Sequence, residues 1–243
     1  MDIKNEEARM LAFQNEIHER IKVRAEESGL SDSDCQPIYD GIADIAGYVS
    51  STPRIMFVLK EAWGEKDENF DKIKGGGYEI WECWRQKKFN TPTWLPLIYI
   101  LYGIHKGQER VEYRDMPKAD MKMVDLLKQS AYININKMPG DTVSGNMRSE
   151  YAIWRDIILK QIEAYNPDII IFGGTFDVIK KDLSLLGRDP IAKTSTEEIA
   201  HFYKDNKDRL LVNAMHPAQR HISWDFYVDE IVDKLRKLCL WND

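Results

Sequence analysis

The chain has 243 residues, and its 34 Lys and Arg against 40 Asp and Glu give a formal net charge of −6. Its composition, 43% hydrophobic and 30% charged, is typical of a globular protein, and its three widely spaced cysteines predict neither a disulfide framework nor a metal site. No apolar run reaches the ~18 residues of a membrane span, and the polar first residues do not resemble a secretory signal, so we expect a cytoplasmic protein without a membrane partner.

Residues 1–30 predict a helix, because Met10, Ile17 and Ile21 recur near helical spacing and Gly29 is a plausible stop. Residues 1–50 hold five Lys and Arg but eleven Asp and Glu, so the rest of the chain has a charge balance of zero. We therefore expect one domain over residues 1–243 with an acidic helical extension over about 1–50. The oligomeric state stays open, with a monomer as the default.

Four short apolar runs predict buried strands, at residues 55–59, 131–135, 169–172 and 210–214. Helical patterns fill the gaps; one ends at Asn166–Pro167 and another covers residues 223–240. Strands that alternate with helices predict an α/β fold with a doubly wound, largely parallel, four-stranded central sheet flanked by helices. The aromatic-rich stretch 75–118 is not assigned.

Polar residues follow each predicted strand, where the ligands of open α/β sheets bind. They are Glu61, Asn134, the Gly173–Gly174 pair and His216. Taken alone, Glu61 suits a loop or helix cap, and His216 suits a structural turn. Asn134 lies on a strand face that should be apolar, so its amide needs either a polar network within the protein or a bound polar ligand. The sequence leaves these two alternatives evenly balanced.

The order of these motifs resembles that of the uracil-DNA glycosylase superfamily, and most closely that of its iron–sulfur branch. The corresponding segments are residues 60–65 (KEAWGE), 133–140 (ININKMPG), 161–167 (QIEAYNP) and 216–218 (HPA). The resemblance spans roughly residues 54–220. It implies the glycosylase-like fold and a base-excision DNA repair activity, the hydrolysis of the N-glycosidic bond of uracil or a related damaged base in DNA.

The chain departs from that branch at several positions. Met138 and Trp154 stand where two cluster cysteines would be, so we expect no iron–sulfur cluster, no other metal and no cofactor. Trp63 stands where family members commonly have Pro, and Ala218 replaces a Ser that contacts phosphate. These substitutions bear on substrate identity and on activity.

The resemblance also implies roles for single residues. Glu61 would orient or deprotonate the attacking water and face the cationic sugar, and His216 would donate a hydrogen bond to the departing base. Asn134 would read the edge of a flipped base.

Further residues would surround the base and the DNA. Tyr78 or Phe89 would stack on the base, although the sequence does not choose between them. Lys137, Gly174 and Arg220 would contact the DNA, with Arg220 on a phosphate or wedged into the vacated stack.

Two other interpretations stay open. One is a catalytically inactive nucleic-acid or nucleotide-binding protein with the same fold. The other is an unrelated α/β hydrolase or small-ligand protein, although the sequence lacks the G-x-S-x-G nucleophile elbow of one such class. The glycosylase interpretation predicts that Glu61, Asn134, Gly174 and His216 border one cleft, and it would fail if Glu61 and His216 lay on opposite sides of the sheet.

Overall fold

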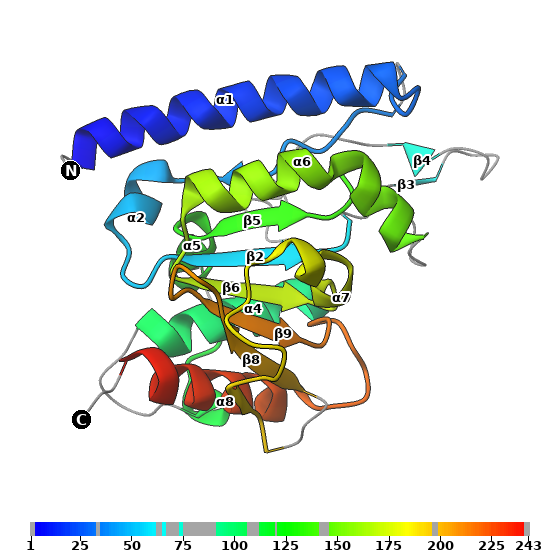
Figure 1. Cartoon of the computed structure of the whole chain (residues 1–243). Helices are drawn as coiled ribbons and strands as arrows, with labels where there is room; N and C mark the ends of the chain where they lie inside the picture. The colour runs from blue at the N-terminus through cyan, green and yellow to red at the C-terminus, as the bar shows by residue number, and fades with distance from the viewer. Residues whose placement is uncertain are drawn as a thin grey trace.

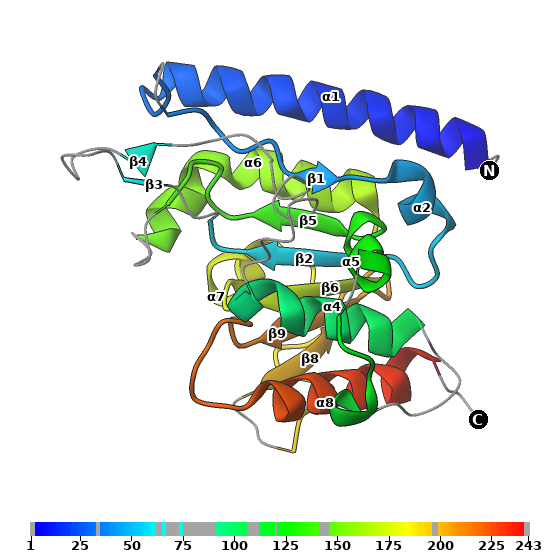
Figure 2. The same cartoon turned by 180° about the vertical axis from the view of Figure 1, so that it is seen from behind.

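The computed structural model describes residues 3–32, 35–61, 65–66, 73–74, 91–105, 112–119, 121–140, 146–195 and 199–240. Within them, a seven-stranded sheet is covered by helices on both faces (Figures 1 and 2). The α/β fold class is therefore confirmed. No helix in these ranges is long and apolar enough to cross a membrane.

The sheet has the order β1-β5-β2-β6-β9-β8-β7. Its strands are β1 (Gly41–Ile42), β2 (Ile55–Leu59), β5 (Ala131–Asn134), β6 (Ile169–Gly173), β7 (Ala192–Lys193), β8 (Ala200–Lys204) and β9 (Leu210–Ala214). The neighbours β5, β2, β6 and β9 pair in parallel, whereas β1, β8 and β7 are antiparallel additions at the edges. A separate antiparallel pair consists of β3 (Glu65–Lys66) and β4 (Ile73–Lys74).

The sheet is larger and more mixed than the predicted four strands. The four apolar runs correspond to β2, β5, β6 and β9, but the edge strands gave no such run. β1 and β7 have only two residues each, and β8 alternates buried and half-buried residues because it lies near the sheet edge. Continuous apolar runs identify strands that are buried on both faces, but they do not identify edge strands of this kind.

Seven helices are described. They are α1 (Ile3–Glu27), α2 (Ile45–Ser50), α4 (Thr91–His105), α5 (Met121–Lys128), α6 (Met147–Tyr165), α7 (Phe176–Ile179) and α8 (Trp224–Leu235). Single 3-10 turns cover Tyr113–Asp115 and Lys180–Asp182, and a π-helical segment, Arg236–Leu240, follows α8. The predicted helices over 1–30, before Asn166 and over 223–240 are thus present. Asn166 ends α6 in the left-handed conformation, with φ of 44°.

Two apolar cores lie on opposite faces of the sheet, and they explain the unbroken apolar strands. On one face, α4, α5 and α8 pack on residues such as Phe57 and Leu59. On the other, α1, α2, α6 and α7 pack on residues such as Val58 and Ile133. Since successive side chains of a strand point to opposite faces, both alternating sets must be apolar. The polar Asn134 is the exception that draws attention to the end of β5.

Candidate functional site

The four parallel strands end at one edge of the sheet, where the arrowheads of β5, β2 and β6 point in the same direction (Figure 1). Leu59 is in register with Asn134, and Gly173 is in register with Ala214. The pairing continues past the strands, because the Asn136 amide donates to the Lys60 carbonyl at 2.9 Å. The loops after the four strands therefore start side by side.

Side-chain packing joins these loops. Gly140 lies directly against the Glu61 side chain, so that a Cβ at position 140 would collide with the Glu61 Cγ. A Cβ at Gly174, whose φ is +72°, would lie 3.5 Å from the His216 Cβ and 3.7 Å from the Lys60 Cε. Glu61 and His216 thus lie at the same edge of the sheet, because Gly174 is close both to His216 and to Lys60, the residue before Glu61.

The His216 imidazole is half-buried and held in one tautomer. Its Nδ1 accepts a hydrogen bond from the Ala218 backbone N–H at 3.2 Å, so the proton of the neutral ring is on Nε2. Burial and, secondarily, the charge of Lys60 lower the pKa of His216 from 6.5 to about 4. The ring is therefore neutral at physiological pH, with an Nε2–H that can donate a hydrogen bond.

Asn134 is fully buried, and one side of its amide is fixed by the protein. The Tyr132 hydroxyl donates to the Asn134 Oδ1 at 2.9 Å, and the Trp94 ring packs on Tyr132 with centroids 4.9 Å apart. Among the described residues, Nδ2 has no hydrogen-bond acceptor. A buried donor in that state costs about 1–3 kcal/mol. The internal network thus satisfies the oxygen, whereas the amino group has no acceptor in the described part of the chain.

Asp40, which sequence reasoning missed, holds Asn134 from behind. Its Oδ2 accepts the Asn134 backbone N–H at 2.6 Å, and its Oδ1 accepts from the Gln161 Nε2 at 2.9 Å. The His18 Nε2 lies 3.0 Å from the Asp40 backbone carbonyl oxygen. Asp40 directly precedes β1, so the predicted acidic extension contributes a buried residue to this edge of the sheet.

The prediction of a DNA contact for Lys137 is wrong. Lys137 is fully buried, and its Nζ donates to both Asp40 carboxylate oxygens, at 2.8 and 2.7 Å, and to the Gln161 Oε1 at 2.8 Å. Burial lowers the pKa of Lys137, and the Asp40 carboxylate opposes this shift. We call Asp40, Lys137 and Gln161 the buried network. These three residues support the end of β5.

A second carboxyl group, Glu150 in the first turn of α6, lies near Glu61. Burial and the charge of Glu61 raise the pKa of Glu150. Its Oε2 is buried and has no hydrogen-bond partner in the described part of the chain. No sequence signal distinguishes Glu150, because an acidic residue in a first helical turn is ordinary.

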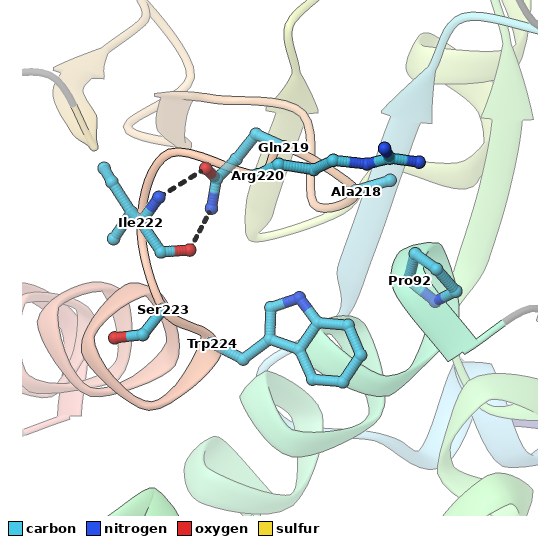
Figure 3. Close-up of a pocket in the computed structure, with 7 residues that line it drawn as sticks. All are labelled: Pro92, Ala218, Gln219, Arg220, Ile222, Ser223 and Trp224. Carbon is cyan, nitrogen blue, oxygen red and sulfur yellow. Dashed lines mark hydrogen bonds between the residues drawn. The ribbon is translucent and has the colours of Figure 1, made fainter.

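Arg220 lies on an exposed loop that follows His216. The Gln219 side chain fastens this loop: its Nε2 donates to the Ile222 carbonyl at 2.9 Å, and its Oε1 accepts from the His221 and Ile222 amides at 2.7 and 2.8 Å. Arg220 is exposed and has no ion-pair partner within the described ranges. Beside it lies an open cavity of about 340 Å³, shown in Figure 3. Its lining residues are Pro92, Ala218, Gln219, Arg220, Ile222, Ser223 and Trp224.

The remaining predicted positions divide into two groups. Met138 and Trp154, the positions of the missing cluster cysteines, are both buried in the apolar core between α6 and the sheet. Within the described ranges, no group of His, Cys, Asp and Glu side chains could hold a metal ion. Tyr78 and Phe89, the predicted stacking residues, lie outside the described residues.

Comparisons with known proteins found no family model and no curated protein that matches this chain.

Proposed function

We propose that this protein is a cytoplasmic DNA glycosylase of the uracil-DNA glycosylase type, which hydrolyses the N-glycosidic bond of uracil or a related damaged base in DNA. The observation that carries the proposal is that a carboxylate, Glu61, and a neutral histidine donor, His216, lie at the same edge of the sheet as the buried amino group of Asn134. Three of the parallel strands, β2, β5 and β9, supply these residues at or just after their carboxyl ends.

The reaction requires stabilisation of two opposite charges. As the bond from the sugar C1′ to the base nitrogen breaks, its electron pair leaves with the base, and the sugar becomes cationic. Glu61 stabilises the cationic sugar and accepts a proton from the water whose oxygen bonds to C1′. The His216 Nε2–H donates to the base oxygen where negative charge develops. A neutral donor suits this role, because it stabilises the base anion without having to give up its own proton.

The Asn134 amide supplies base selection. Its Nδ2 is a donor in a fully buried position, whereas its Oδ1 already accepts from Tyr132. A donor there matches a carbonyl oxygen, as on uracil, and opposes an amino group, as on cytosine. A base with the wrong group would leave two buried donors facing each other, which is the kind of mismatch that binding sites reject strongly.

The test is base excision from labelled single- and double-stranded DNA that contains uracil, followed by cleavage at the abasic sites. We expect excision by the wild type and by Glu26→Gln, an exposed glutamate of α1 that serves as the matched control, and loss of excision in Glu61→Gln. Binding of the uracil-containing DNA without excision of any base by the wild type would favour the inactive nucleic-acid-binding alternative instead.

A further inference from the structure

The cavity beside Arg220 is connected to both halves of the proposed site. Ala218 lines the cavity, and its backbone N–H donates to the His216 Nδ1. On the other side, Pro92 lines the cavity from the first turn of α4, and Trp94 in the same helix packs on Tyr132, which fixes the Asn134 amide. The cavity is therefore built from the loop that carries His216 and from the helix whose Trp94 packs on Tyr132.

The walls of the cavity combine an aromatic surface with a cation. Figure 3 shows the Trp224 indole and the Pro92 ring at two sides of this space, with the Arg220 side chain extending along another. Trp224 is half-buried at the start of α8, and Arg220 is exposed. The volume, about 340 Å³, is near the lower limit of small-ligand pockets and suits one planar ring system.

Hydrogen bonds within the loop of residues 216–222 hold the shape of the cavity. The three hydrogen bonds of the Gln219 side chain and the bond from the Gln219 amide to the His216 carbonyl, at 2.9 Å, fix residues 216–222 before any ligand binds. Preorganisation of this kind lowers the cost of ordering the protein on binding.

We propose that this cavity is a subsite for the nucleobase next to the excised base, in which Trp224 stacks on that base and Arg220 binds a flanking phosphate. The inference rests on the proposed function and adds a substrate preference to it, for a strand whose neighbouring base is unstacked. An indole face accepts any base, so the subsite contributes affinity without reading sequence. The guanidinium suits a phosphate because it can donate two hydrogen bonds to its oxygens.

The experiment measures binding without turnover, in the Glu61→Gln background. The probes are short fluorescein-labelled single-stranded oligonucleotides with one uracil, either intact or with an abasic residue on the 5′ or the 3′ side of it. With Trp224 present, we expect one of the two abasic probes to bind roughly tenfold more weakly than the intact probe. With Trp224→Ala added, the intact probe should bind roughly tenfold more weakly, and the abasic residue should cost nothing further.

Two more variants separate stacking from folding. Trp224→Phe should retain most of the affinity difference between the intact and abasic probes. Phe226→Ala removes an exposed aromatic side chain from the same helix and should behave like the Glu61→Gln parent.

The subsite would be overturned if the abasic probes bound as tightly as the intact probe. It would also be overturned if the abasic residue weakened binding equally with and without Trp224. Uracil excision by the wild type together with that result would leave the glycosylase proposal standing. A loss of affinity at the abasic residue that depends on Trp224, without excision of any base by the wild type, would instead support the subsite and remove the glycosylase proposal.

Discussion

Asn134 and His216, the two side chains proposed to hold the base, are positioned in opposite ways. Asn134 is fully buried and depends on Asp40, a residue 94 positions earlier in the chain, which is itself paired with Lys137. His216 lies on a loop whose hydrogen bonds join residues only two or three positions apart. The Asn134 half of the site is therefore inseparable from the folded core, whereas the His216 half can be altered with little cost to stability.

The largest expected effect is on stability, at the buried network. Asp40→Ala leaves the Lys137 ammonium buried without its carboxylate, and we expect the free energy of unfolding to fall by about 3–5 kcal/mol. Asp156→Ala is the matched control, because it removes the exposed ion pair with Arg24 and should cost about 1 kcal/mol or less. Urea-induced unfolding measures both. Equal losses for the two variants would show that the buried network is no more important than a surface pair.

The next effect is on base selection. Asn134→Asp replaces the buried amino donor with an acceptor, and we expect kcat/KM for uracil excision to fall on the order of 10²-fold. Tyr132→Phe, which keeps the donor and removes only the hydroxyl bonded to Oδ1, should cost less. The measurement compares kcat/KM for DNA containing uracil with that for DNA containing other bases. An unchanged base preference in Asn134→Asp would contradict the role of the amide.

A smaller effect concerns the pH dependence of the loop. The imidazole of His216 should titrate near pH 4 by NMR, because its pKa is lowered to about 4 in the folded protein. The unfolded chain binds this proton near pH 6.5, so protonation favours unfolding. Stability should therefore fall, relative to His216→Gln, as the pH decreases from about 6.5 to about 4. Titration of His216 near pH 6.5 would contradict the buried neutral donor.

The smallest effect is at the tip of the loop. Arg220→Ala should weaken binding to different DNA sequences by a similar few-fold factor, since a phosphate contact reads no base. It should also reduce the slope of log affinity against log salt by roughly 0.7–0.9. Arg188→Ala, at an exposed position before β7, is the control and should leave the slope unchanged. A change in sequence preference would instead indicate contact with a base.

The sequence predicted the parts of the fold that are buried on both faces. The runs at 55–59 and 169–172 are apolar at every position, because β2 and β6 lie in the middle of the sheet with a core on each side. The two-residue β1 and β7 could not be predicted, because they are defined by pairing with distant strands rather than by a pattern of their own.

The candidate site was predicted only where strand ends identify it. Glu61, Asn134 and His216 follow recognisable strands, so their convergence follows from parallel topology. Lys137 and Asp40 are 97 positions apart, and Lys and Asp are residue types that usually lie at the surface. Their burial as a pair therefore leaves no local signal in the sequence. A motif position that predicts a DNA contact, Lys137, therefore belongs to the core.

The most direct test of the proposed chemistry is the separation of rate from affinity in Glu61→Gln and His216→Ala. We expect the single-turnover rate of uracil excision to fall by roughly 10²–10³ in His216→Ala and at least as far in Glu61→Gln, while the Kd for the same DNA stays within a few-fold of the wild type. In the proposed mechanism both groups act mainly in the transition state, so their loss should barely affect ground-state binding. Undiminished excision by both variants would contradict the assignment of Glu61 and His216 as catalytic residues.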